Sequence, residues 1–354
     1  MSALFTPFQI RSMELKNRIV VSPMQQYSAQ NGIPGAWHLV HLGSRAVGGA
    51  GLLITECTAV SAEGLCTLYD TGIWNEVQTE AWKPIVNFVH DQGAKIAVQL
   101  WHAGGKGSTT HPKDGMKPLA PAQGGWIAKS ASATPINQHL PVEMTIDEIK
   151  QTQEDFAYAA KNAVKAGFDA IELHAAHGYL IHQFYSEMIN KRTDDYGGSF
   201  ENRIRFLTEI VQQLRSVIPK EMPLMLRLSA VDYDGGTHGW KLEDSVKLAA
   251  ILKGMGVDFI TASGGGFVQV DQTIVKPNYQ LSFATAIKNK TDLPTGAVGM
   301  ITDAQQADEI IKDRKADLVV IAREHLRDPY FALHAAIELN ETADIPWQYE
   351  RGFN

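Results

Sequence analysis

Short apolar runs alternate along the chain with longer stretches in which apolar residues recur every three or four positions. Most of the short runs are continuous rather than alternating, which is typical of strands that are covered on both faces of a parallel sheet. Eight such runs lie at residues 18–22, 52–56, 96–100, 170–174, 224–229, 259–263, 295–298 and 318–322. The pattern therefore predicts eight buried, parallel strands.

The longer stretches have the period of amphipathic helices, and some carry clear start and stop signals. Thr145 and Glu148 have the spacing of a capping box at the start of a helix that runs to about Ala166, and Gly167 suits its C-terminal cap. Pro219 ends the predicted helix at 200–217. The expected helices cover residues 76–91, 145–166, 200–217, 242–255, 303–312 and about 328–339.

Eight strand–helix units in 354 residues predict an α/β fold, a (β/α)₈ TIM barrel, formed by residues 1–354 as one domain. The runner-up is a doubly wound open sheet, which would carry a turn such as GxGxxG after its first strand. Residues 22–28 read SPMQQYS instead. Residues 5–17 resemble a hairpin that closes the barrel floor. The irregular segment of about 102–144 after the third strand is expected to be a capping loop.

Composition and charge narrow the function classes. With 44% hydrophobic and 20% charged residues, the chain is globular. It has 32 Lys and Arg against 39 Asp and Glu, and it lacks a basic tract, so we expect no nucleic-acid partner and no membrane-surface helix. Cys57 and Cys66 form no disulfide framework or zinc motif. Without a signal-peptide core or an apolar run of roughly 20 residues, we expect a soluble, cytoplasmic protein.

In a TIM barrel the active site lies at the C-terminal ends of the strands, and two features there suggest anion binding. Arg227 interrupts the apolar run LMLRLS, and a buried guanidinium needs an anion or several acceptors. Either an internal carboxylate or a bound ligand could supply that anion. Gly296 and Gly299 stand at the end of the seventh strand and Arg323 follows the eighth, where barrels commonly bind phosphate.

His174, His177 and Tyr179 follow the fourth strand. Metal-binding histidines on a helix usually stand four residues apart, whereas this pair stands three apart. Two neutral imidazoles can each donate one N–H group and hold an oxyanion from two directions. The Tyr179 phenol could donate a proton in a dry site. Either histidine by itself could equally cap a loop.

Seven ordered blocks of the sequence resemble the old yellow enzyme family of FMN-dependent NAD(P)H:flavin oxidoreductases and ene-reductases, and most closely its short bacterial, thermophilic-like class. The similarity extends over nearly the whole chain. The blocks are LFTPFQIRSMELKNRIVVSPM at 4–24, QLWHAG at 99–104, ELHAAHGYLIHQF at 172–184, NKRTDDYGGSFENRIRFL at 190–207, GAVGMIT at 296–302, AREHLRDP at 322–329 and QYERG at 348–352.

The resemblance implies a bound FMN and assigns residues to it. Arg227 would neutralise the charge at the N1/O2 edge of the flavin, which supplies its missing anion. Gln25 stands where the family usually has Cys or Thr, near the N5/O4 edge. The implied FMN-binding residues are Ser22, Pro23, Met24, Gln25, Cys57, Gln99, Arg227, Val298, Gly299, Ala322 and Arg323, of which the last four would hold the phosphate.

The resemblance also implies an activity. NADPH or NADH would reduce FMN, which would pass a hydride to the β-carbon of an α,β-unsaturated carbonyl or nitro compound. His174 and His177 would bind the substrate oxygen, Tyr179 would protonate the α-carbon, and Tyr27 would contact the substrate. No metal takes part. Arg351 would reach a neighbouring subunit's site, so we expect a homodimer or homotetramer. The alternatives are a non-catalytic FMN-binding redox protein and a metal-dependent barrel lyase or isomerase.

Overall fold

Eight parallel strands form a closed barrel at the centre of the computed structural model, which describes residues 2–235 and 239–352. The first barrel strand pairs with both the second and the last, and this pairing closes the barrel. The prediction of a TIM barrel is therefore confirmed. In chain order the strands are β3 (Ile19–Val21), β4 (Leu52–Ala59), β6 (Lys95–Trp101), β9 (Ala170–Ala175), β10 (Leu224–Ser229), β11 (Phe259–Ser263), β12 (Thr295–Ala297) and β13 (Leu318–Ile321).

The register of the strands groups the polar residues of the barrel. Arg227 on β10 lies opposite His174 on β9 and opposite Thr261 on β11. Gln99 on β6 lies opposite Glu172 on β9. Because residues opposite one another in a ladder point to the same face of the sheet, the barrel interior gathers these side chains near one another.

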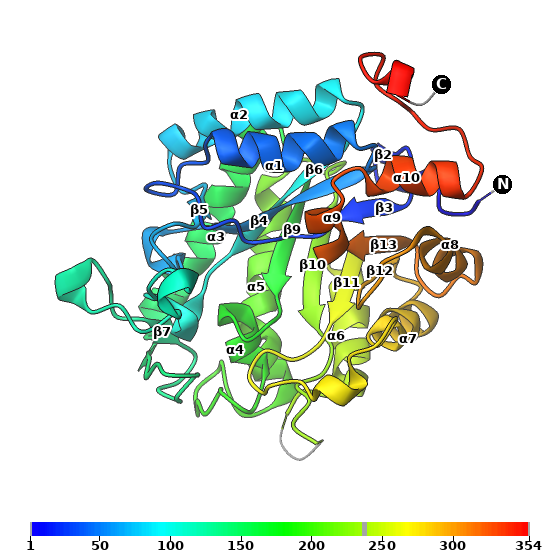
Figure 1. Ribbon diagram of the computed structural model, residues 1–354. Coiled ribbons are helices and arrows are strands. Elements are labelled where there is room, and N and C mark those ends of the chain that lie inside the picture. The colour runs from blue at the N-terminus through cyan, green and yellow to red at the C-terminus, as the bar shows by residue number, and fades with distance from the viewer. Residues whose placement is uncertain (1, 236–238, 353–354) are drawn as a thin grey trace.

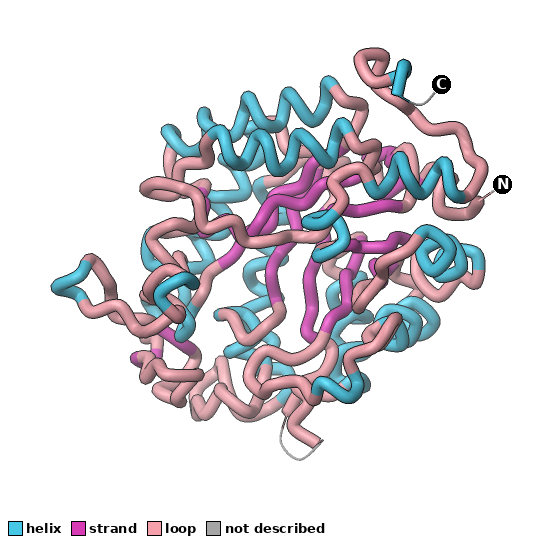
Figure 2. Tube along the Cα trace, viewed as in Figure 1, coloured by secondary structure: helices cyan, strands magenta, loops and turns pink. Residues whose placement is uncertain are grey.

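Helices surround the barrel, with the strands inside (Figures 1 and 2). The expected capping box is formed, since Thr145 Oγ1 accepts from the Glu148 nitrogen at 3.2 Å and Glu148 Oε2 accepts from the Thr145 nitrogen at 2.8 Å. The helices are α1 (Ala36–Val47), α2 (Glu76–Asp91), α3 (Ile146–Ala166), α4 (Leu180–Tyr185), α5 (Phe200–Val217), α6 (Leu242–Gly254), α7 (Leu281–Thr291), α8 (Ala304–Lys312), α9 (Arg323–Arg327) and α10 (Phe331–Glu338).

The predicted last helix over about 328–339 is confirmed as α10, which begins at Phe331. A short helix that was not expected from the sequence, α9, precedes it. Asp328, between them, has φ −128° and ψ 94°. Pro329 explains the break, because its ring disfavours a helical conformation for the residue before it. Helices α1, α4 and α7 were also not among those expected from the sequence.

A hairpin closes the bottom of the barrel, as the sequence predicts. Its strands, β1 (Phe8–Ile10) and β2 (Met13–Leu15), are antiparallel. Ile10, Met13 and Leu15 belong to one apolar cluster with residues of the barrel strands, among them Val20 and Met225. The N-terminal ends of the strands are thereby sealed with apolar side chains, which leaves the C-terminal ends as the open mouth.

The segment that follows β6 is irregular and in part projects from the molecule (Figure 1). It contains the short helices η2 (Gly104–Lys106), η3 (Pro112–Asp114) and η4 (Pro121–Gln123) and the two-residue strands β7 (Lys129–Ser130) and β8 (Val142–Glu143). Another short strand, β5 (Thr71–Gly72), pairs with the end of β4. None of the helices in the described ranges has the length and apolar character needed to cross a membrane.

Candidate active site at the mouth of the barrel

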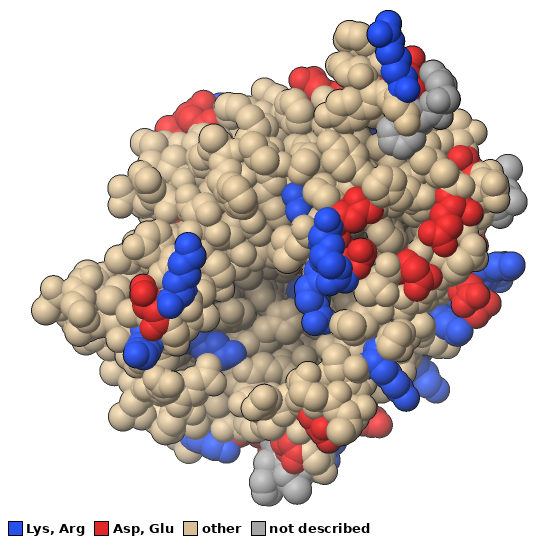
Figure 3. Space-filling view, in the orientation of Figure 1, with Lys and Arg blue, Asp and Glu red and all other residues tan. Residues whose placement is uncertain are grey.

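A cavity of about 290 Å³ lies at the C-terminal ends of β3, β10, β11, β12 and β13. Figure 3 shows that this face of the molecule is hollowed near its centre and that Lys and Arg side chains gather on one rim of the hollow. Seven residues singled out from the sequence line the cavity together. They are Ser22, His177, Arg227, Val298, Gly299, Ala322 and Arg323.

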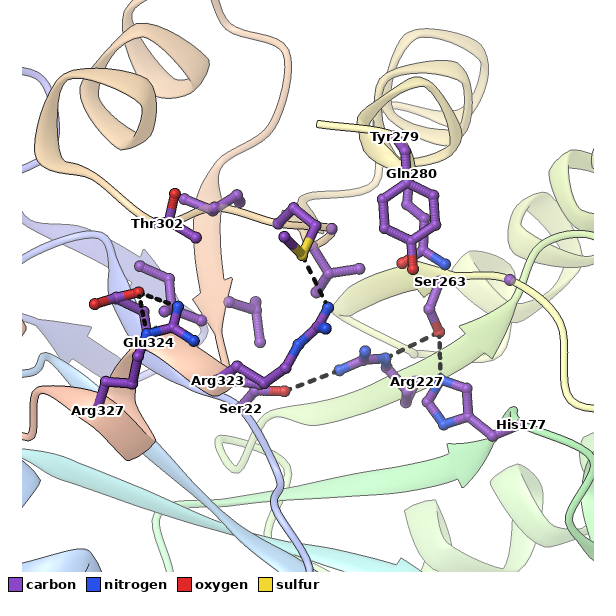
Figure 4. Close-up of a pocket in the computed structure, with 18 residues that line it drawn as sticks. Ser22, His177, Arg227, Ser263, Tyr279, Gln280, Thr302, Arg323, Glu324 and Arg327 are labelled. Carbon is purple, nitrogen blue, oxygen red and sulfur yellow. Dashed lines mark hydrogen bonds and ion pairs between the residues drawn. The ribbon is translucent and has the colours of Figure 1, made fainter. Parts of the chain in front are cut away.

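Arg227 lies at the buried end of this cavity, and its hydrogen-bond partners among the described residues are hydroxyl groups (Figure 4). Its Nε donates to Ser263 Oγ at 3.1 Å and its Nη1 to Ser22 Oγ at 3.3 Å. Burial lowers the pKa of Arg227, while the Glu172 carboxylate acts to raise it. Among the described residues no carboxylate forms an ion pair with Arg227, so the cavity itself fits an anionic or acceptor group.

The other end of the cavity also suits an anion. Gly299 has φ 112°, and a Cβ atom there would lie 3.0 Å from the Gln280 nitrogen, so only glycine fits. Arg323, the first residue of α9, contacts the Met300 sulfur at 3.0 Å rather than a carboxylate. A glycine turn, a helix start and a guanidinium converge here, as expected of a phosphate site.

The two histidines and Ser263 form a chain of contacts that leads to Arg227. The His177 Nδ1 atom lies 3.3 Å from His174 Nε2, and His177 Nε2 lies 2.9 Å from Ser263 Oγ. Burial is the main cause that lowers the pKa of both imidazoles well below the usual value, and the Arg227 charge adds to it. Both rings are therefore neutral near neutral pH, and each carries one N–H donor.

Tyr179 packs beside this pair, at the start of α4. Its ring centroid lies 5.2 Å from that of His174 and 5.1 Å from that of Trp101. Lys106 Nζ lies 5.1 Å from the Tyr179 ring centroid. Burial raises the pKa of the Tyr179 phenol well above its usual value, so the hydroxyl stays protonated. The arrangement places a neutral acid next to two neutral hydrogen-bond donors.

Two glutamines beside the site are held by buried carboxylates. Gln99 Nε2 donates to Glu172 Oε1 at 2.7 Å, and Cys57 Sγ donates to Gln99 Oε1 at 3.2 Å. Gln25 Nε2 donates to Asp70 Oδ1 at 2.8 Å, and Gln25 Oε1 is buried with no hydrogen-bond partner. Gln25 therefore offers an unpaired carbonyl oxygen and the one amide hydrogen that Asp70 leaves free.

Tyr27 and Arg351 lie apart from the cavity lining. Pro23 and Met24 lead from β3 to Tyr27, which has φ 50° and whose ring centroid lies 5.9 Å from that of His111 in the capping segment. Arg351 is exposed in the short helix η6 (Glu350–Gly352) at the C-terminal end. The structure does not bring Arg351 to its own chain's cavity, and residues 353 and 354 of this tail lie outside the described residues.

Ser263 and Lys106 are the contacts that sequence reasoning missed. Ser263 ends β11 and joins His177 to Arg227, and Lys106 follows β6. Their positions, at the end of β11 for Ser263 and after β6 for Lys106, were the available signal, because a single Ser or Lys carries no motif of its own. In the described ranges, no three His, Cys, Asp or Glu side chains come together as metal ligands would, and this includes the surroundings of His174 and His177.

Known proteins resemble this chain over nearly its full length. Residues 3–342 match the family described as NADH:flavin oxidoreductase / NADH oxidase. The NADPH dehydrogenase of Bacillus subtilis is 45% identical over 352 residues, which cover 99% of each chain. The NADPH dehydrogenase of Listeria monocytogenes strain EGD-e is 43% identical over 355 residues, which cover 100% of each chain.

Solved structures agree with these sequence relatives. Morphinone reductase has a TM-score of 0.79 and 28% identity, and the match covers 97% of this chain and 91% of that one. The old yellow enzyme homologue from Zymomonas mobilis has a TM-score of 0.79 and 29% identity, with coverage of 96% and 93%. One structure of morphinone reductase is a complex with tetrahydroNAD.

The names of these relatives are those of dehydrogenases and reductases. They favour an oxidoreductase over the metal-dependent lyase or isomerase and the non-catalytic flavin-binding protein considered from the sequence. The anion-binding ends of the cavity also fit FMN, which carries a phosphate and a ring that becomes negatively charged on reduction. The chain therefore belongs to the NADH:flavin oxidoreductase / NADH oxidase family, the old yellow enzymes, and is an FMN-dependent NAD(P)H oxidoreductase.

Proposed function

We propose that this enzyme reduces the activated C=C bond of α,β-unsaturated carbonyl or nitro compounds. The observation that carries the proposal is the neutral pair His174–His177 beside the protonated Tyr179 at the barrel mouth. The chemistry that bound FMN would supply is hydride transfer, from NADPH or NADH to the β-carbon of the alkene.

We assign FMN to the cavity at the strand ends. Arg227 would face the flavin edge that becomes anionic, since its partners in the described part of the chain are two hydroxyl groups. Gln99 would hydrogen-bond the pyrimidine edge through the amide hydrogen that Glu172 leaves free. Ser22, Pro23, Met24, Gln25 and Cys57 would contact the ring, and Val298, Gly299, Ala322 and Arg323 would hold the phosphate.

The two histidines would bind the carbonyl or nitro oxygen of the substrate. Each neutral imidazole has one N–H group, and His177 Nδ1 and His174 Nε2 face each other at 3.3 Å, so N–H groups on these two atoms would converge on one oxygen. Two donors on this oxygen withdraw electron density from the conjugated double bond, which favours hydride addition at the β-carbon. Because the donors are fixed by the fold before the substrate arrives, little reorganisation accompanies the reaction.

Tyr179 would then protonate the α-carbon. Its phenol is held protonated by burial, and the Lys106 ammonium group 5.1 Å from the ring centroid would stabilise the negative charge that proton loss creates. Tyr27, on the rim beside His111, would contact the part of the substrate that extends toward the capping segment.

The direct test is turnover of cyclohexenone by the purified FMN-loaded protein with NADPH under nitrogen. We expect cyclohexanone to form in step with NADPH oxidation. Cyclohexanone offered as the substrate is the control, because its double bond is already saturated. If NADPH is oxidised only when oxygen is admitted and no alkene is reduced, the proposed function is wrong.

We further propose that the C-terminal tail completes the site of a second subunit. Trp347 is 76% exposed, and Arg351 lies on an exposed turn, although a tail of this composition would ordinarily dock on something. Within its own chain the tail has a contact between Tyr349 and Tyr330, whose ring centroids are 6.1 Å apart. A two-fold assembly would let each tail dock on the other subunit.

Deleting the residues after Pro346 is expected to shift the protein to a smaller species in sedimentation velocity. Because the deletion removes a hydrogen bond that the charged Arg351 would donate, kcat/KM for cyclohexenone should fall by about tenfold or more. The variant Arg351→Ala should keep the parental assembly and show only the fall in kcat/KM. A truncated protein with parental assembly and parental kinetic constants would exclude the shared site.

A further inference from the structure

The turn that carries His177 has an unusual backbone. His177 has φ 56° and Gly178 has φ 75°, so two successive residues lie in the left-handed region. A Cβ atom on Gly178 would lie 2.4 Å from the Gly266 carbonyl oxygen, so this turn also touches the loop after β11. A non-glycine residue keeps such a conformation only where its surroundings impose it.

Four side chains hold all four backbone polar groups of this turn. The His177 N–H donates to Ser229 Oγ at 2.9 Å, and Lys106 Nζ donates to the His177 carbonyl at 2.7 Å. The Gly178 N–H donates to His182 Nδ1 at 2.9 Å, and Gln183 Nε2 donates to the Gly178 carbonyl at 2.8 Å. Of these four hydrogen bonds, only the one to His182 requires a particular ring nitrogen, Nδ1, to be unprotonated.

A buried aspartate sets that tautomer. His182 Nε2 lies 2.7 Å from Asp232 Oδ1, and both side chains are 0% exposed. The other oxygen of Asp232 accepts from Ser186 Oγ at 2.5 Å and from the Trp240 nitrogen at 2.8 Å. Burial acts to raise the pKa of Asp232, but its partners, His182 first among them, hold that pKa below the usual value. The ionised carboxylate accepts from Nε2–H and leaves Nδ1 free to accept from Gly178.

The His182 ring is also fixed in space. Its centroid lies 4.6 Å from that of Tyr185, with the rings stacked, and 4.4 Å from that of Phe267. The ring therefore cannot turn to exchange its two nitrogens without displacing the Tyr185 and Phe267 rings. Packing fixes the orientation of the imidazole, and Asp232 determines which of its two nitrogens carries the proton.

We propose that Asp232 and His182 are positioning residues for the enone reduction. Through the Gly178 N–H they hold the turn in the conformation that places the His177 ring beside His174. This inference rests on the proposed role of His177 in binding the substrate oxygen. A pair that served only to fill the core would not need an unprotonated Nδ1 facing the backbone of the active-site turn.

Two substitutions of His182 separate this role from simple packing. The amide oxygen of His182→Asn can occupy the place of Nδ1 and accept from Gly178, whereas the amide of His182→Gln reaches the place of Nε2 and leaves Gly178 without an acceptor. We expect His182→Gln to lower kcat/KM for cyclohexenone, and the affinity for the phenol para-hydroxybenzaldehyde, by roughly 10- to 100-fold. His182→Asn should retain most of the parental kcat/KM and most of the affinity for the phenol.

The matched control is His90→Gln. His90 Nε2 also lies 2.7 Å from an aspartate, Asp169, but at the opposite end of β9. This variant should keep parental kinetic constants. FMN content and thermal unfolding are measured for every variant, so that loss of folded protein is not mistaken for loss of positioning.

Equal effects of His182→Asn and His182→Gln would overturn the proposal. If His182→Gln does not fold, Asp232→Asn replaces it. Its amide can donate to Nε2 and permit the wrong tautomer, so a parental affinity for the phenol would contradict the inference. Should the parent protein fail to reduce cyclohexenone, the proposed function fails, while the phenol affinities of the variants still decide whether Asp232 and His182 position the turn.

Discussion

Replacing Tyr179 with Phe is expected to slow the reoxidation of the reduced enzyme by cyclohexenone by about 10²–10⁴-fold, the usual contribution of a positioned general acid. The substitution removes only the hydroxyl group. The contacts of the ring with His174 and Trp101 can remain, so binding of the enone should be little changed. Anaerobic stopped-flow absorbance of the flavin gives the rate constant and the apparent affinity separately.

A quinone is the control for this variant. It accepts reducing equivalents at oxygen, so it needs no proton on carbon, and Tyr179→Phe should oxidise reduced FMN with a quinone at the parental rate. A loss of similar size with both oxidants would mean that the variant has disturbed the site rather than removed its acid. An unchanged rate with cyclohexenone would take Tyr179 out of the proposed role.

Removing a histidine of the pair is expected to have the second large effect. His174→Ala should lower kcat/KM for cyclohexenone by about 10²–10³-fold, which corresponds to roughly 2.7–4 kcal/mol for one preorganised donor to an oxyanion. Because burial lowers the pKa of both imidazoles well below 6.5, acidification to about pH 6 leaves them neutral. The affinity for a neutral enone should therefore be flat from pH 6 to pH 8.

For His177 the informative substitution is Asn. Ala at this position would combine loss of the donor with the strain of a positive φ, whereas Asn keeps an N–H donor and tolerates the left-handed region. His177→Asn should lose less activity than His174→Ala. Parental kinetic constants in His174→Ala, or an affinity that falls steeply between pH 7 and pH 6, would contradict the role of a neutral donor pair.

The fold was predictable because its signals are local. Continuous apolar runs such as 224–229 became barrel strands, and the capping box at Thr145 formed as expected. Helix α1 was not predictable in this way, because its buried face carries polar residues, including His38, His41 and Arg45, which hide the apolar period. Helix α9 was not predicted because it is only five residues long and ends at Arg327, just before Pro329.

The site was predictable as a set of strand ends but not as a network. Arg227 was conspicuous as a charge inside an apolar run, yet the sequence could not decide between an internal carboxylate and a ligand. That answer depends on Ser263 and Ser22, which come to Arg227 from other strands. The Asp232–His182 contact joins residues 50 positions apart, and the meeting of their loops is a tertiary property.

The close approach of Gly178 to Gly266 limits which positions near the site can be substituted. A Cβ atom on Gly266 would lie 2.2 Å from the Gly178 nitrogen, so a side chain at either position would force the loop after β11 away from the turn that carries His177. A combinatorial library should leave both glycines untouched. Variation in substrate range is instead best sought at residues 109–139 of the segment after β6. Much of the surface there is exposed, and the turn of His177 and Gly178 does not depend on these residues.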